Sequence, residues 1–206
     1  MKLYFKPGAC SLAPHIVLCW MEQPFELEPA NTQDPEFLKI NYMSAVPVLM
    51  TDDMGALYQT SAILRYLARL PAGEHLGPIN DPVLQYQCDY WLSFFNTDVY
   101  RVMVPWFAPH KLTTDTTDAA HDAIKAAVPE RIAPWLQRMD NHLASRTWYM
   151  DEHKSIVDAC AFVFELWATQ ILPDGLSNYP HVARHFQDLN EDAGVRRALS
   201  AEGLNL

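Results

Sequence analysis

The chain has 206 residues, of which 50% are hydrophobic and 19% are charged, so it can bury a substantial core and is not intrinsically disordered. Its 15 lysines and arginines against 25 aspartates and glutamates give a net charge of −10, which argues against nucleic acid and anionic membrane surfaces as partners. We find no signal-peptide pattern and no apolar stretch of about 18 residues, and we therefore expect a cytoplasmic protein. The four cysteines are widely spaced, without a CxxC pair, and no metal site is predicted.

Short strand and helix patterns alternate along the first 70 residues in the order βαβ-αββα. The expected strands cover residues 2–6, 25–28, 48–51 and 56–58. The expected helices cover residues 11–23 and 35–40, and a third helix begins at residue 60 or 61. Ser11 is the expected N-cap of the first helix. Because the first strand, helix and second strand are short and consecutive, we expect the two strands to pair in parallel through a right-handed crossover.

Prolines and glycines interrupt this pattern between residues 70 and 82, and only helical periodicity follows. The expected helices cover residues 83–106, 115–144, 155–172, 181–190 and 194–201. The second of these is expected to kink or split at its internal prolines. Ser155 and Asp158 have the spacing of a capping box at the start of the most apolar helix. We therefore predict an α/β domain over residues 1–78 and an all-α domain over residues 83–206.

Cys10 and Ser11 lie where the first strand leads into the first helix, so free backbone N–H groups and the positive end of the helix dipole face this turn. A helix N-terminus lowers the pKa of a cysteine thiol and would equally stabilise the thiolate of a bound ligand. The simpler alternative is that Ser11 is an ordinary helix cap and Cys10 a packed turn residue.

Two further segments have the pattern of a peptide-binding site. Val46-Pro47 directly precedes a strand, and a cis bond there would present the Val46 backbone N–H and C=O to a ligand lying alongside as an extra strand. A trans proline at the end of a loop is the alternative. Gln59, Thr60 and Ser61 place a side-chain amide, a hydroxyl and free backbone N–H groups at the start of a helix, which suits a carboxylate.

These segments resemble bacterial beta-class glutathione S-transferases, and the similarity spans essentially the whole chain. It is carried by residues 4–15, Val46-Pro47, residues 59–63, the Ser155-Asp158 box and residues 197–204. The resemblance implies a thioredoxin-like N-terminal domain, a helical C-terminal domain and a homodimer. It also implies that glutathione binds as co-substrate, with its cysteine backbone on Val46 and Pro47. Its γ-glutamyl end would lie near Gln59 and Thr60, and its sulfur at the Cys10 turn.

The chain departs from the family pattern over residues 98–101, where the family usually has Glu, an apolar residue, His and Lys. Tyr100 replaces the histidine; it can donate a hydrogen bond to a thiolate, but it carries no positive charge near neutral pH. Asp98, Arg101 and Ser93, the last in place of a common asparagine, lie in the region that the resemblance places against glutathione at the dimer. The loop 31–34 lacks the usual lysines, so an attraction for the glycine carboxylate is missing.

The resemblance implies transfer of glutathione sulfur to small, largely apolar electrophiles, with Ser11, Cys10 and Tyr100 as candidate groups at the thiolate. Two alternatives stay open: glutathione-dependent thiol exchange or peroxide reduction through Cys10, and a non-catalytic binding protein on the same fold. The apolar helix 83–106 and the domain edge near residues 50–70 are the expected dimer interface. Part of an aromatic stripe is expected to line the electrophile pocket, and its members are Tyr90, Trp91, Phe94, Tyr100, Trp106 and Phe107.

Overall fold

The computed structural model describes residues 1–78, 80–150 and 153–204, and its N-terminal part contains a four-stranded sheet. The strand order is β2-β1-β3-β4, and the strands are β1 (Lys2–Phe5), β2 (Glu26–Pro29), β3 (Val48–Thr51) and β4 (Gly55–Tyr58). Strand β1 pairs in parallel with β2 and antiparallel with β3, and β3 pairs antiparallel with β4. The predicted parallel pair and hairpin are confirmed.

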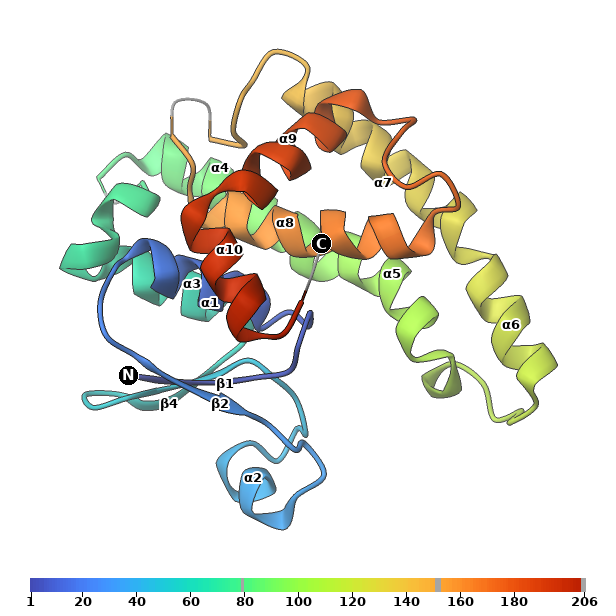
Figure 1. Ribbon diagram of the computed structural model, residues 1–206, viewed down its shortest axis with the longest axis horizontal. Coiled ribbons are helices and arrows are strands. Elements are labelled where there is room, and N and C mark those ends of the chain that lie inside the picture. The colour runs from blue at the N-terminus through green and yellow to red at the C-terminus, as the bar shows by residue number, and fades with distance from the viewer. Residues whose placement is uncertain (79, 151–152, 205–206) are drawn as a thin grey trace.

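Three helices accompany the sheet: α1 (Leu12–Trp20), α2 (Pro35–Ile40) and α3 (Thr60–Arg69). Helices α1 and α3 lie on one side of the sheet and α2 lies on the other (Figure 1). Asp34 caps α2 by accepting a hydrogen bond from the Glu36 N–H, as its Asp-Pro start predicts. Every residue of α1 is buried, because this helix lies between the sheet and the helical part, where it packs against helices of the C-terminal half.

The predicted cap of α1 is wrong. An N-cap residue normally has an extended backbone that lets its side chain reach the free N–H groups of the first turn. Ser11 instead has a helical backbone, with φ −65° and ψ −18°, and makes no capping hydrogen bond. The helix also ends at Trp20 rather than near residue 23, because Glu22 adopts a left-handed conformation with φ 55° that turns the chain away.

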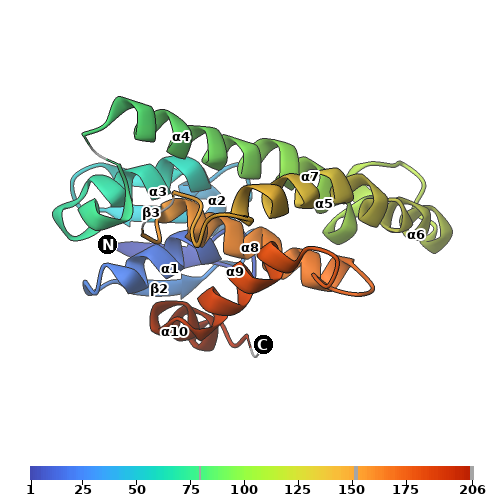
Figure 2. The ribbon, with the colours of Figure 1, turned by 90° about the horizontal axis from the view of Figure 1, so that it is seen from above.

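The C-terminal part is helical, with α8 passing through its middle (Figures 1 and 2). Its α-helices are α4 (Pro82–Ser93), α5 (Tyr100–Phe107), α6 (Asp118–Ala126), α7 (Val128–Leu143), α8 (Ile156–Ile171), α9 (Pro180–Glu191) and α10 (Ala193–Ala201). The expected helix 83–106 is interrupted by a π-helical segment, Phe94–Val99, that joins α4 to α5. The expected helix 115–144 is split between α6 and α7, and Pro129 lies in the first turn of α7. The capping box of Ser155 and Asp158 is confirmed at the start of α8.

The two parts share one buried core. Helix α1 packs against α8 and α10, and the Trp20 indole Nε1 donates a 2.7 Å hydrogen bond to Asp192 Oδ1 between α9 and α10. The predicted domain boundary at residues 78–83 falls between a 3₁₀ helix, Pro71–Leu76, and α4, and it stays a prediction. Within the described ranges, no helix is long and apolar enough to cross a membrane.

Candidate active site

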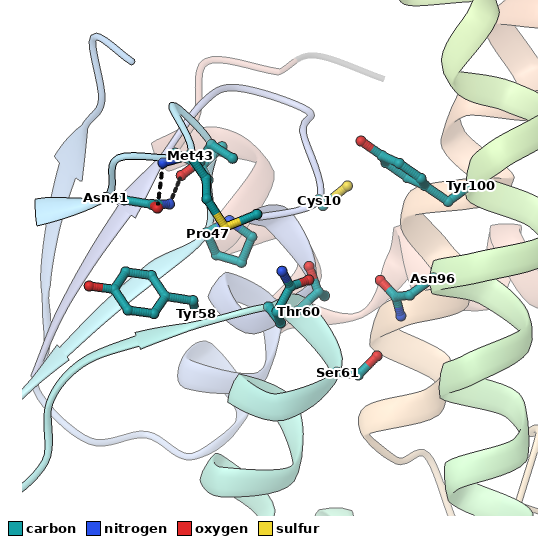
Figure 3. A pocket seen from close by; sticks show the side chains of 12 residues that line it. Cys10, Asn41, Met43, Pro47, Tyr58, Thr60, Ser61, Asn96 and Tyr100 are labelled. Atoms are coloured by element: carbon teal, nitrogen blue, oxygen red, sulfur yellow. Dashed lines mark hydrogen bonds between the residues drawn. The ribbon is translucent and has the colours of Figure 1, made fainter. Parts of the chain in front are cut away.

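A cavity lies between three loops of the sheet part, which follow β1, precede β3 and follow β4, and the helical run that leads into α5 (Figure 3). The predicted site residues that the structure brings together around it are Cys10, Val46, Pro47, Gln59, Thr60 and Tyr100. They come from four segments that are far apart in the sequence. The fold therefore assembles the thiol turn, the proline loop and the helix start into one site, as the sequence motifs predict.

The proline loop is held by a buried side chain that the sequence analysis did not single out. The Val46-Pro47 bond is cis, as expected for a ligand-binding strand edge. Asn41 Nδ2 donates to the Ala45 carbonyl at 2.8 Å, and Asn41 Oδ1 accepts from the Met43 N–H at 3.1 Å (Figure 3). These two hydrogen bonds fix the loop that leads into Val46, and so the backbone that a bound peptide would meet.

The start of α3 forms a second wall of the cavity. Gln59 has φ 70° and ψ 121°, a left-handed region that costs a non-glycine residue about 1–3 kcal/mol. This conformation turns the chain from β4 directly into α3, so that Thr60 and Ser61 line the cavity. The first N–H groups of a helix have no partner within the helix and attract a negative charge. A carboxylate is the chemical group that this wall suits.

Cys10 and Tyr100 point toward one another across the cavity (Figure 3). Burial raises the pKa of the Cys10 thiol to about 12, more than the backbone of its turn lowers it. The raised pKa favours the alternative in which Cys10 is a packed turn residue and the turn stabilises the thiolate of a ligand. Burial, together with the neighbouring Cys10, also raises the pKa of Tyr100, so its hydroxyl keeps its proton near neutral pH and can donate it to a hydrogen bond.

Ser11 lies behind the Cys10 turn rather than in the cavity. Its side chain is fully buried, with 0% exposed. Ser11 Oγ accepts a hydrogen bond from the Lys6 N–H at 3.1 Å and donates one to the Lys6 carbonyl at 3.2 Å. Both hydrogen bonds tie the turn to the end of β1, so the structure gives Ser11 the position of a turn-stabilising residue.

The helical run from α4 to α5 contributes a different polar residue from those predicted. Ser93, Asp98 and Arg101 lie outside the lining of the cavity, and Ser93 is exposed. Asn96 lines the cavity instead, where its amide donates to the Leu92 carbonyl at 2.9 Å and contacts Cys160 Sγ at 3.2 Å. No distinct signal in the sequence marks Asn96, because Thr97 and Asp98 follow it in the same polar stretch.

A second, more apolar hollow adjoins the first and shares Cys10, Val46 and Tyr100 with it. Phe107 and Trp167 extend it away from the sheet, with the Trp167 ring centroid 5.1 Å from Phe107 and 6.2 Å from Tyr100. Of the predicted aromatic stripe, Tyr100 and Phe107 line this hollow. The other members pack against the core, and they are Tyr90, Trp91, Phe94 and Trp106.

The turn before Cys10 is held by the C-terminal helices. Glu202 Oε2 accepts a 2.9 Å hydrogen bond from the Gly8 N–H, and the Trp167 indole donates a 2.8 Å hydrogen bond to the Gly8 carbonyl. Glu202 Oε1 lies 2.8 Å from His15 Nδ1. Burial alone lowers the pKa of His15, but hydrogen bonds with Cys19 and Glu202 outweigh it and raise that pKa to about 9. A buried ion pair therefore anchors the thiol turn to the helical part.

A mixed four-stranded sheet with a cis-proline loop, followed by a helical part that closes the cavity, defines the glutathione transferase fold. Among the described residues, no group of three or more His, Cys, Asp and Glu is arranged to hold a metal ion. The sequence profile of the glutathione S-transferase N-terminal domain matches residues 8–70, and that of the C-terminal domain matches residues 100–192. The chain belongs to the glutathione S-transferase family, a family of transferase enzymes, as its motifs predicted.

Individual relatives agree with this assignment over the full length. A glutathione S-transferase of Xanthomonas campestris pv. campestris is 36% identical over 208 residues, which cover 100% of both chains. A sphingomonad glutathione S-transferase solved in complex with glutathione has a TM-score of 0.85 and 32% identity over 100% of both chains. A beta class glutathione S-transferase of Sphingomonas chungbukensis has a TM-score of 0.86 and 29% identity, again over 100% of both chains.

Proposed function

We propose that this protein binds glutathione in the cavity between Cys10 and Tyr100 and transfers its sulfur to small, largely apolar electrophiles. Three features that line one cavity carry the proposal. The cis-proline loop at Val46 offers a strand edge to a peptide, the start of α3 suits a carboxylate, and the protonated Tyr100 hydroxyl is a hydrogen-bond donor. The sphingomonad relative that was solved with glutathione supports the choice of ligand. Conjugation of reactive electrophiles in this way is a detoxification reaction.

In this proposal glutathione lies extended along the cavity. Its cysteine backbone pairs with the N–H and C=O of Val46 in the manner of an added strand. Its γ-glutamyl carboxylate binds at the start of α3, beside Gln59, Thr60 and Ser61. The glutathione sulfur then reaches the space between Cys10 and Tyr100, next to the apolar hollow that would hold the electrophile.

The chemistry requires the glutathione thiol to lose its proton, because the thiolate is the nucleophile. The Tyr100 hydroxyl stabilises the thiolate by donating a hydrogen bond, and each unit by which the thiol pKa falls corresponds to about 1.4 kcal/mol. The sulfur then forms a bond to the electrophilic carbon, and the leaving group departs with the electron pair of the bond that breaks. The thiol proton goes to water.

The raised pKa of Cys10 favours conjugation over thiol exchange. Exchange needs a protein thiolate, and a thiol with a pKa of about 12 is almost entirely protonated near neutral pH. Position 13, three residues after Cys10, holds Ala13, so a second thiol is absent there. A non-catalytic binding protein, in turn, has no physical need for a hydroxyl donor directed at a sulfur site.

Replacing Tyr100 by phenylalanine is expected to lower kcat/KM for 1-chloro-2,4-dinitrobenzene about 10- to 100-fold, because a hydrogen bond to a charged group is worth about 1.5–3 kcal/mol. The pKa read from the pH dependence of kcat/KM should rise in the same variant. Tyr42→Phe, at an 87% exposed tyrosine outside the lining of both hollows, is the matched control and should match the wild type. If conjugation is instead lost in Cys10→Ser and kept in Tyr100→Phe, the chemistry belongs to Cys10.

We also propose a homodimer that uses α4. Val83 and Tyr86 are 65% and 71% exposed at helical spacing, and Met54, at the turn between β3 and β4, is 61% exposed. The exposed Ser93 continues the same helix, so we keep the prediction that Ser93, Asp98 and Arg101 approach glutathione across the dimer interface.

Sedimentation equilibrium is expected to give twice the mass of one chain. Tyr86→Asp should shift the equilibrium toward the monomer, whereas Leu112→Asp, at another exposed apolar residue, should not. A fully active monomer in the wild type would contradict the dimer proposal.

We propose a cytoplasmic location for the enzyme. All four cysteines are free, and Cys19, Cys88 and Cys160 are buried, which suits a reducing compartment. Cell fractionation followed by detection of the chain tests this location, and recovery outside the cytoplasmic fraction would contradict it.

A further inference from the structure

The apolar hollow beside the sulfur site differs in charge from the rest of the molecule. The whole chain carries 25 acidic residues and a net charge of −10. The lining of this hollow nevertheless includes Lys6 and Lys111 and, among the described residues, no aspartate or glutamate. The Glu202 carboxylate behind the Gly8 turn is buried and paired with His15, so the cations in the lining of this partly enclosed hollow create a positive local potential that attracts anions. An acidic protein therefore presents a basic second-substrate site.

The two lysines come from different parts of the chain. Lys6 follows β1, and its Nζ donates a 2.8 Å hydrogen bond to Thr32 Oγ1. This places Lys6 beside the 31–34 loop, where the sequence lacks the lysines expected for the glycine carboxylate of glutathione. Lys6 is therefore the cation available to the glycine end of glutathione. Lys111 ends the 3₁₀ helix Pro109–Lys111 after α5 and lines the hollow from the helical side.

Phe107 and Trp167 form an aromatic wall in the same hollow as Lys111. The Trp167 ring is fixed by its 2.8 Å hydrogen bond to the Gly8 carbonyl, and the Phe107 ring packs against it at a tilt of 56°. Phe107 is nevertheless 44% exposed, which is a large exposed area for a phenylalanine. A flat ring laid on Phe107, with its edge toward the largely buried Trp167, would cover this area and gain the interactions of aromatic pairs.

We propose that the preferred electrophiles are aromatic molecules that carry a negative charge, such as a carboxylate. The ring would lie on Phe107 with its edge toward Trp167, and the charged group would pair with Lys111, with the amide of Gln170 as a further donor in the same lining. This inference rests on the proposed glutathione transfer. For a chloroarene, the glutathione sulfur bonds to the ring carbon, the carbon–chlorine bond breaks, chloride leaves with the electron pair and the thiol proton goes to water.

The test compares 4-chloro-3,5-dinitrobenzoate with neutral 1-chloro-2,4-dinitrobenzene. Lys111→Ala should lower kcat/KM for the benzoate about fivefold more than for the neutral compound, and Lys111→Arg should restore most of the difference. Ratios of variant to wild type remove the different intrinsic reactivities of the two compounds. Lys39→Ala, an exposed lysine on α2, is the control and should change neither value. The preference for the benzoate should also shrink as salt is added.

Equal losses for the two compounds in Lys111→Ala, or no loss for either, would overturn the charge-pairing inference while conjugation itself persists. A wild-type protein that conjugates neither compound and binds no glutathione would instead overturn the proposed function. A selective loss for the benzoate that the arginine variant restores supports the inference.

Discussion

Replacing Asp158 by alanine is expected to destabilise the protein by about 3–5 kcal/mol, because it removes one partner from a buried network of charges and hydrogen bonds. The Asp158 carboxylate is fully buried and accepts hydrogen bonds from the Tyr149 N–H at 2.8 Å, the Ser155 N–H at 2.7 Å and the Ser155 hydroxyl at 2.8 Å. It also lies 3.0 Å from His185 Nε2. One side chain therefore caps α8, fixes the segment before it and joins α8 to α9.

The charge of His185 enlarges this effect. Burial alone lowers the pKa of His185, but the carboxylates of Glu165 and Asp158 outweigh it and raise that pKa to about 10. The imidazolium in the folded protein is thus balanced by two carboxylates, and Asp158→Ala leaves Glu165 as the remaining partner. Because α8 lies at the centre of the helical part, we expect the Asp158→Ala variant to lose stability throughout that part.

Urea unfolding followed by circular dichroism measures the difference. Asp188→Ala is the matched control, since Asp188 is a half-exposed aspartate on α9 whose partner Arg184 lies at the surface, and it should alter the free energy of unfolding little. An Asp158→Ala variant that unfolds within about 1 kcal/mol of the wild type would show that the network contributes little.

Replacing Ser61 by aspartate is expected to weaken glutathione binding at least about 50-fold without destabilising the fold. Ser61 lines the cavity in the first turn of α3, where we place the γ-glutamyl carboxylate. Two like charges about 4 Å apart near a protein surface repel by several kcal/mol. The same aspartate is favourable for the helix, because an acidic residue in the first turn interacts well with the helix dipole. The aspartate is therefore expected to lower the affinity for glutathione while it stabilises the helix.

Ser61→Ala separates the added charge from the lost hydroxyl. Among the described parts of the chain, the Ser61 hydroxyl makes a long hydrogen bond, 3.5 Å to the Leu92 carbonyl, so its removal should change glutathione affinity no more than a few-fold. Calorimetric titration gives both affinities, and thermal unfolding gives both stabilities. Wild-type affinity in Ser61→Asp would mean that the carboxylate of glutathione lies elsewhere.

Two features that depend on neighbouring residues in the sequence were predicted well, although the Ser11 cap was not. The capping box of Ser155 and Asp158 joins residues three positions apart, and the Asp34-Pro35 start of α2 depends on one turn of chain. We could predict that the motifs at Cys10, Val46 and residues 59–61 form one site because the resemblance to glutathione S-transferases supplied their long-range arrangement. Local sequence patterns do not contain this information.

Features that depend on packing between distant segments were not predicted. The pKa of Cys10 is set by how much water reaches the thiol, and this depends on α5, about 90 residues further along the chain. A π-helical turn holds more residues than an α-helical turn, so Phe94–Val99 shifts the faces of the helix beyond it. Periodicity read as one continuous helix could not show that Asn96 faces the cavity rather than Ser93 or Arg101, and Tyr100 was predicted only through the resemblance.

Isothermal titration of the purified protein with glutathione tests the central claim most directly. The account predicts saturable heat with one glutathione bound per chain at submillimolar affinity, and the loss of that heat in Ser61→Asp under the same conditions. An absence of heat from the folded wild-type protein at millimolar glutathione would contradict the claim that this cavity is a glutathione site.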